Sequence, residues 1–170
     1  MLVMTKPFLA LTAKDLMNGD VVRIPRDMGM QAAARWLDQM HVSGAPVVDE
    51  QGRCVGVLSS GDFVACCAAN NTRCAQHRAE ANRGPCTCEG CVSSEWQMVN
   101  VAERIEGSVR DHMTPDPVTA PPETTIGRLA QMMVDAHIHR LIIIDEQRRP
   151  LGIVSTTDIV AAVARVGIDE

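Results

Sequence analysis

The chain contains two copies of one segment. Residues 110–165 match residues 14–69 without a gap when the two segments are aligned 96 positions apart. The matched identities include Asp15 with Asp111, Met17 with Met113, Pro25 with Pro121, His41 with His137, Gly56 with Gly152, and Asp62 with Asp158. A gapless match of this length indicates two copies of one structural unit. Residues kept in both copies are therefore those that the unit needs.

The size of each copy predicts how the copies are arranged. The 170 residues suit one compact body, and each half of about 55 residues rarely buries enough apolar surface alone. We therefore expect the halves to pack on each other. Hydrophobic residues make up 46% of the chain and aromatic residues 2%, so the core must be aliphatic.

Charge and hydropathy argue against a nucleic-acid-binding protein and against a membrane or secreted protein. The net charge is −5, whereas binding to the phosphate backbone of nucleic acids needs a clustered basic face. No run has the length of a transmembrane helix, and none resembles a secretory signal peptide. We expect a cytoplasmic protein that binds neither nucleic acid nor membrane.

The periodicity of apolar residues predicts the same elements in both copies, and together they form an α/β (α+β) fold. Each unit reads β-α-β-β-α after a short leading helix, for which Thr12 and Ser108 are candidate N-caps. The predicted helices are the leading helices 12–17 and 108–113, the long amphipathic helices 28–40 and 124–136, and the final helices 60–69 and 156–166. The predicted strands are the first strands 21–24 and 118–120 and the hairpin strands 45–48, 54–58, 141–144 and 151–154.

Three parts of the chain follow from this order. The first unit occupies residues 10–69 and the second occupies residues 108–170. Residues 70–107 form an insert that is rich in Cys and too short for a core of its own. Within the insert, residues 94–105 are expected to form a helix.

Several short motifs recur in order in both units. The run Gly56-Val57-Leu58-Ser59-Ser60-Gly61-Asp62-Phe63 follows a strand that ends in Asp49. The run Gly152-Ile153-Val154-Ser155-Thr156-Thr157-Asp158-Ile159 follows a strand that ends in Asp145. The second unit opens with Asp111-His112-Met113-Thr114-Pro115. Together these motifs resemble the cystathionine β-synthase (CBS) domain over about two thirds of the chain.

The resemblance implies a stand-alone CBS pair, with two repeats packed about a pseudo-two-fold axis and two clefts between them. In the family such clefts bind adenosine-containing ligands: AMP, ADP, ATP, NAD or S-adenosylmethionine. CBS pairs are regulatory modules and often form dimers, so we expect a homodimer that signals to an unidentified regulated protein. The chain has no P-loop and no nucleophile motif with a plausible base, so we do not expect an enzyme.

The pattern Ser-x-x-Asp at the start of each final helix has two interpretations. In the family, Asp62 and Asp158 would accept hydrogen bonds from both ribose hydroxyls, because an ionised carboxylate has two acceptor oxygens. The hydroxyls of Ser59, Ser155 and Thr156 and the helix N-terminal amides would then lie near phosphate. The same pattern is also a capping box, which would stabilise the helix without any ligand.

The first strand of each unit is implied to reach the cleft of the other unit. Thr119, Ala120 and Pro121 would line the Asp62 cleft, and residues 23–25 (Arg23, Ile24 and Pro25) would line the Asp158 cleft. Thr119 matches the family's usual hydroxyl. Arg23 departs from that pattern, because a long cation there would either reach phosphate or fill the cleft. The alternative is an edge strand whose side chains face solvent.

His139 and Arg140 resemble the His-Arg pair that contacts phosphate in AMP-sensing members of the family. The planar guanidinium of Arg140 can donate to two phosphate oxygens. The first unit has Ser43 and Gly44 at these positions, so we expect the two clefts to differ. A solvated loop before a strand is the alternative.

The insert carries a possible metal site. Cys74, Cys86, Cys88 and Cys91 supply four thiols, with His77 as a substitute, which is enough for a tetrahedral zinc ion. Free thiols, a redox-sensitive disulfide and an iron–sulfur site are the alternatives. Cys54, Cys66 and Cys67 lie outside the insert and are expected to pack as small hydrophobic residues.

Three functional hypotheses follow. The first is a regulatory module that binds an adenine nucleotide and changes a partner or oligomer interface. The second is a metal-responsive or redox-responsive interaction protein that uses the insert. The third is a structural dimer with empty clefts.

Overall fold

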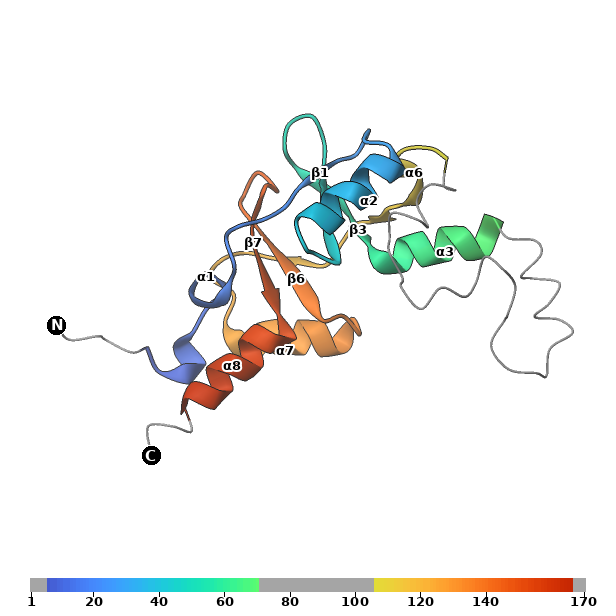
Figure 1. Ribbon diagram of the computed structural model, residues 1–170. Helices are drawn as coiled ribbons and strands as arrows, with labels where there is room; N and C mark the ends of the chain where they lie inside the picture. Colours follow the sequence, from blue (N-terminus) through green and yellow to red (C-terminus); the bar gives the residue numbers. More distant parts are fainter. Residues whose placement is uncertain (1–5, 71–105, 167–170) are drawn as a thin grey trace, which may run out of the picture.

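The computed structural model describes residues 6–70 and 106–166 and has the predicted mixed α/β architecture (Figure 1). The first repeat contributes η1 (Phe8–Ala10), α1 (Ala13–Leu16), β1 (Ile24–Pro25), α2 (Met30–Gln39), β2 (Gly44–Val48), β3 (Cys54–Ser59) and α3 (Ser60–Asn70). The second contributes α6 (Val109–His112), β4 (Thr114–Pro115), β5 (Thr119–Ala120), α7 (Ile126–Asp135), β6 (Arg140–Ile144), β7 (Pro150–Ser155) and α8 (Thr156–Val166). The helix expected over residues 94–105 lies outside the described residues.

Two sheets carry the fold, with the orders β1-β2-β3-β4 and β5-β6-β7. In each sheet the first strand runs parallel to the second, which forms an antiparallel hairpin with the third. Strand β1 begins at Ile24 rather than at the expected residue 21, because its pairing with β2 covers only Ile24 and Pro25; the N–H of Val21 instead bonds to the carbonyl of Gly19. β4 belongs to the second repeat by sequence but pairs with β3 of the first. The sheet of the first repeat is therefore completed by a strand of the second repeat.

The leading helices are exchanged between the repeats, which the sequence does not predict. Figure 1 shows α1 beside α8. The N–H of Ala13 donates to the carbonyl of Thr124, and the N–H of Val109 donates to that of Met28. These two bonds are equivalent under the 96-residue offset. Each leading helix thus stabilises the repeat to which it does not belong by sequence.

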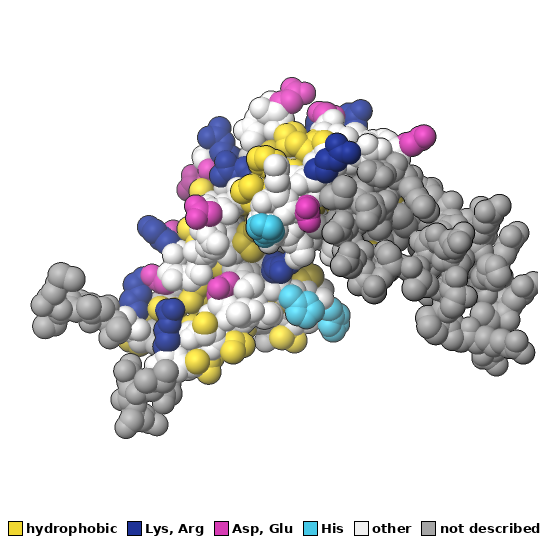
Figure 2. Space-filling view, viewed as in Figure 1, with side chains coloured by type: hydrophobic (Ala, Val, Ile, Leu, Met, Phe, Trp, Pro, Cys, Tyr) yellow, Lys and Arg dark blue, Asp and Glu magenta, His cyan; other side chains and the backbone are white. Residues whose placement is uncertain are grey.

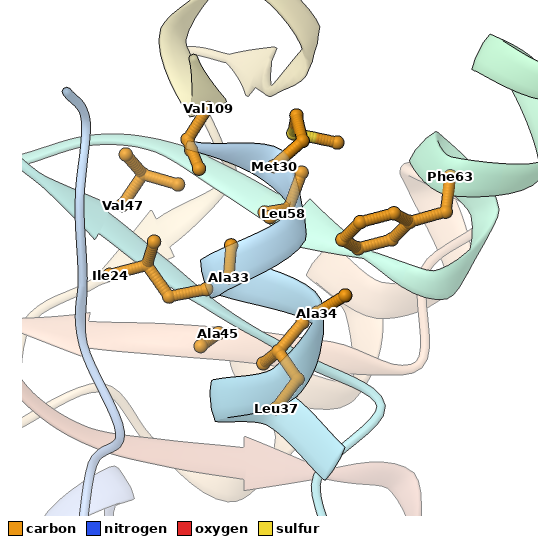
Figure 3. Packing of buried hydrophobic residues seen from close by; sticks show 10 residues of the cluster. All are labelled: Ile24, Met30, Ala33, Ala34, Leu37, Ala45, Val47, Leu58, Phe63 and Val109. Atoms are coloured by element: carbon orange, nitrogen blue, oxygen red, sulfur yellow. The ribbon is translucent and has the colours of Figure 1, made fainter. Parts of the chain in front are cut away.

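The cores confirm this exchange. The cluster of the first repeat includes Val109 from α6 (Figure 3). Its other members are Ile24, Met30, Ala33, Ala34, Leu37, Ala45, Val47, Leu58 and Phe63. The cluster of the second repeat includes Ala13 from α1, with Leu16 and Met17 packed against it. Both cores are aliphatic except for Phe63, as the composition predicts.

Both repeats use the same Met–Gly contact where the exchanged segment crosses a sheet. A Cβ atom added to Gly152 would lie 2.5 Å from the Sδ atom of Met17. A Cβ atom added to Gly56 would lie 2.5 Å from the Sδ atom of Met113. The repeated Gly is thus required by a close approach between repeats, which explains why both copies keep both residues.

The repeated His also has a backbone role. His41 and His137 both have a φ of 53°, in the left-handed region. The N–H of His41 bonds to the carbonyl of Asp38, and the next N–H, that of Val42, bonds to the carbonyl of Leu37. This is a Schellman motif that ends α2, and the second repeat has the same bonds at the end of α7. The repeated His therefore reverses the chain at the end of each long helix.

Candidate nucleotide-binding site

Asp62 has both carboxylate oxygens engaged. It lies in the first turn of α3, where its Oδ2 accepts bonds from the N–H of Ser59 at 2.7 Å and from the Ser59 hydroxyl at 2.8 Å. Its Oδ1 accepts a bond of 2.9 Å from the hydroxyl of Thr114 on β4. A ribose diol that bound both oxygens would have to share Oδ1 with the Thr114 hydroxyl or displace it.

Asp158 has the same cap but no equivalent of Thr114. Its Oδ2 accepts bonds from the N–H and hydroxyl of Ser155, at 2.7 Å and 2.6 Å. The Asp158 N–H donates back to the Ser155 hydroxyl at 3.3 Å, which completes the capping box. Among the residues that the structure describes, none donates to Oδ1. One oxygen of this half-buried carboxylate is therefore open to a ligand.

Two further helices begin in the same way. Asp15 caps α1 through Thr12, and Asp111 caps α6 through Ser108. The Lys6 ammonium, bonded to Asp15 at 2.7 Å, and then the Thr12 N–H lower the pKa of Asp15 to about 2. The Ser108 N–H lowers the pKa of Asp111. The capping interpretation is thus confirmed at Asp62 and Asp158, and Asp15 and Asp111 form the same cap; a ligand contact at Asp62 or Asp158 stays a prediction.

The first strands place little side-chain chemistry in the clefts. The side chains of Ile24 and Ala120 are buried in the two cores, so only their backbone groups can face a ligand. Thr119 is half-buried in β5, and Pro25 and Pro121 are exposed.

Arg23 is bonded away from Asp158. Its Nη2 donates to the carbonyl of Pro150 at 2.9 Å. Pro150 begins β7 and Ser155 ends it, and a strand of this length spans roughly 17 Å. Asp158 lies just after the C-terminal end of β7. The Arg23 guanidinium therefore joins the two repeats at the other, N-terminal end of this strand.

Arg140 lies between the repeats. Its Nη1 donates to the hydroxyl of Ser43 at 2.8 Å, and Ser43 is the position that matches His139. The carbonyl of His139 accepts the N–H of Thr156 at the start of α8. An exposed cation is thus held where the loops before β2 and β6 meet, available to an anion.

An apolar groove of about 480 Å³ lies on the helical face of the second repeat, with His139 and Thr156 at its edge. The other lining residues are Ala130, Met133, Val134, His137, Ile138, Ile159 and Val160. Figure 2 shows hydrophobic side chains at the surface over this part of the molecule, and charges of both signs interspersed elsewhere. The lining of this groove does not include Asp158, but it includes two other residues of the predicted nucleotide site, His139 and Thr156.

The predicted metal ligands Cys74, Cys86, Cys88 and Cys91, with His77, lie outside the described residues. Within residues 6–70 and 106–166, no group of three His, Cys, Asp or Glu side chains is arranged to hold a metal ion. No helix in that part of the chain is long and apolar enough to span a membrane.

Sequence reasoning missed Thr114 and Ser43 as partners of candidate site residues. The 96-residue offset carried a signal for Thr114, because it aligns this residue with Asn18 and so marks a difference between the repeats. Ser43 was noted only as the residue that replaces His139.

Comparison with known families matches the CBS domain model to residues 13–68 and 109–165. The chain belongs to the CBS domain family. Each match begins in the leading helix that packs on the other repeat, so the two matched segments contact each other through these helices.

The chain is similar to one curated sequence and to two solved CBS-pair structures. The uncharacterized protein MJ1426 of Methanocaldococcus jannaschii is 28% identical over 94% of this chain and 88% of its own. The structure of CBSX2 from Arabidopsis thaliana in complex with AMP has a TM-score of 0.65 at 20% identity, covering 92% of this chain and 98% of the other. The CBS pair of protein MJ0100 in complex with 5′-methylthioadenosine and S-adenosylmethionine has a TM-score of 0.64 at 20% identity, with the same coverage.

Proposed function

We propose that this CBS pair binds an adenine nucleotide of the AMP, ADP or ATP type at the Asp158 cleft and communicates its binding to a partner or oligomer interface. The role is regulatory rather than enzymatic. The observation that carries the proposal is the Asp158 carboxylate, which is held by Ser155 through one oxygen and has the other open.

The surroundings of Asp158 support this choice. The carboxylate lies at the start of α8, an 11-residue helix whose first N–H groups favour an anion. Arg140 supplies an exposed cation at the junction between the repeats. A nucleotide has a ribose that can donate hydrogen bonds and a phosphate that carries negative charge. The carboxylate suits the ribose, and the arginine and the helix N-terminus suit the phosphate.

The ligands of similar structures support the ligand class. CBSX2 was solved with AMP, and the MJ0100 pair with 5′-methylthioadenosine and S-adenosylmethionine. All three ligands carry adenosine or a thio-derivative of it. For this chain we propose a nucleotide with phosphate, because Arg140 is available to pair with a negative charge.

The proposed output is an interface on the helical face of the second repeat. Val134, Val160 and Val163 are 66%, 64% and 53% exposed on α7 and α8, next to the apolar groove. Apolar side chains gathered in this way favour burial against another protein surface. We propose that a second copy of the chain covers this face.

Calorimetric titration with AMP, ADP and ATP tests the binding proposal on wild type, Asp158→Asn and Asp62→Asn. Asn preserves an acceptor for the cap and removes the charge. We expect one tight site per chain, lost in Asp158→Asn and retained in Asp62→Asn. Asp111→Asn is the matched control, because it alters the same type of cap at α6 without touching a cleft.

The alternative outcomes are distinct. Two equal tight sites would contradict the asymmetry between the repeats. Loss of stability in Asp158→Asn with no heat of binding in wild type would favour a structural CBS pair, in which the Ser-x-x-Asp groups serve only as caps.

A further inference from the structure

Cys66 lies against a histidine. Its Sγ atom is 3.1 Å from Nδ1 of His112, and both residues are half-buried. The contact joins α3 of the first repeat to the exchanged helix α6 of the second. Cys66 packs against the core of the first repeat, as the sequence predicted, and its sulfur also contacts the His112 ring.

The second ring nitrogen determines which tautomer is present. Nε2 of His112 is 2.9 Å from the carbonyl oxygen of Glu106, which can only accept a hydrogen bond. Nε2 must therefore carry the proton, and Nδ1 of the neutral ring is the acceptor. The thiol of Cys66 then donates to Nδ1, and the imidazole is in place to take its proton.

The backbone supports the position of the ring. Gly107 has a φ of 100°, a conformation that favours glycine, and directly follows the carbonyl that holds Nε2. A Cβ atom added there would lie 3.3 Å from Nε2. The glycine therefore gives the His112 ring the space it needs beside Glu106.

We propose that Cys66 and His112 form a reactive thiol site that small hydroperoxides oxidise. The thiolate, not the thiol, is the nucleophile, and an adjacent histidine is a general way of generating it. The Cys66 proton moves to Nδ1, and the carbonyl of Glu106 stabilises the imidazolium through Nε2. Cys66 is half-buried whereas Cys54 is 1% exposed, so we expect a small molecule to reach Cys66 more readily than Cys54.

With hydrogen peroxide the reaction is balanced. The Cys66 sulfur attacks one peroxide oxygen, so an S–O bond forms and the O–O bond breaks. Sulfur loses two electrons and the peroxide gains them. The departing hydroxide takes the proton from His112 and leaves as water, and Cys66 becomes a sulfenic acid.

Cys54 provides an internal comparison. It is 1% exposed, its thiol contacts the carbonyl of Gly56, and burial raises its pKa. Both thiols belong to the same molecule, so one digest reports both rates. We therefore expect Cys66 to react faster than Cys54 in the folded protein.

The test measures the rate of carbamidomethylation by iodoacetamide at pH 7 on the intact chain, resolved by peptide mass spectrometry. Hydrogen peroxide followed by dimedone then traps the sulfenic acid. We expect His112→Gln to slow modification of Cys66 about tenfold in both assays, with Cys54 unchanged. Loosening of the fold would expose both thiols and raise both rates, so a fall confined to Cys66 supports the proposal.

His112→Asn is the second variant, because its amide can still contact Cys66 but cannot take the proton. We expect it to be as slow as His112→Gln. The proposal would be overturned if Cys66 were modified at the wild-type rate in either variant. It would also be overturned if Cys66 reacted no faster than Cys54 in the wild type. Circular dichroism verifies that each variant is folded.

Discussion

The hydroxyl of Thr114 donates to Oδ1 of Asp62 at 2.9 Å, so a residue of the second repeat engages a carboxylate oxygen of the first. The matching position in the first repeat is Asn18, whose side chain instead accepts the N–H of Asp20. The open oxygen of Asp158 follows from this single difference. Two repeats with the same Ser-x-x-Asp motif thus offer different surfaces to a ligand.

Thr114→Val should make the Asp62 cleft available. Valine has nearly the shape of threonine but cannot donate, so Oδ1 of Asp62 loses its partner. Calorimetry should then show a second, weaker nucleotide site, provided that the proposed function is correct. An unchanged stoichiometry would mean that Thr114 does not limit binding at Asp62.

The ribose hydroxyls should contribute strongly to affinity. A hydrogen bond to a charged group contributes about 1.5–3 kcal/mol, so 2′-deoxy-AMP should bind roughly 10-fold to 100-fold more weakly than AMP. In Asp158→Asn the difference between the two nucleotides should shrink. A wild-type protein that binds both equally would place the ribose away from Asp158.

Gly152→Ala should destabilise the chain, because the added Cβ would meet the Sδ, Cγ and Cβ atoms of Met17 within 2.8 Å. Overpacking of this kind costs about 1–3 kcal/mol of unfolding free energy, measured by urea denaturation. The second substitution Met17→Ala should recover part of the loss. Gly127→Ala is the control, since nothing lies within 4 Å and removal of a helical glycine should add up to about 1 kcal/mol.

Acid should release one contact of the N-terminal segment. The pKa of Asp15 is lowered to about 2 by Lys6 and Thr12, below the ordinary value of 3.8. Stability from this carboxylate is therefore present above pH 3.8 and is lost as the pH falls toward 2. An NMR titration of Asp15 should show this midpoint, and Lys6→Ala should raise it. The effect on stability will be small, because the Lys6 side chain is 54% exposed.

The proposed dimer should depend on the helical face of the second repeat. Val160→Glu places a charge next to the apolar groove, so sedimentation should show a shift toward monomer. Val118→Glu is the control, because this exposed valine lies outside α7 and α8. A monomeric wild type would contradict the proposed dimer, and so would a dimer that tolerates Val160→Glu.

The elements themselves were predictable because their signals are local. Apolar periodicity placed α2 and α7 to within two residues at most ends, and the hairpin strands to within one. Thr12 and Ser108 were identified as caps because a cap depends on residues three apart. The first strand of the first repeat was predicted less accurately, as residues 21–24 instead of Ile24–Pro25, because pairing with β2, rather than composition, sets its ends.

The site was only partly predictable. The motif identified Asp62 and Asp158, but it could not distinguish a cap from a ligand contact, since both use the same carboxylate. Ile24 and Ala120 were expected at the clefts, and their side chains lie in the cores. The roles of Arg23 and Arg140 depend on carbonyl and hydroxyl groups more than 90 positions away.

The sequence by itself determined the duplication, the order of helices and strands, the caps at Thr12 and Ser108, and membership of the CBS family. These features depend on spacing within a few residues or on the comparison of one repeat with the other. Only the tertiary structure decided that the leading helices are exchanged, that Thr114 covers Asp62, and that His112 lies against Cys66. Each of these contacts joins the two repeats, and no local pattern encodes how two similar surfaces are oriented when they pack.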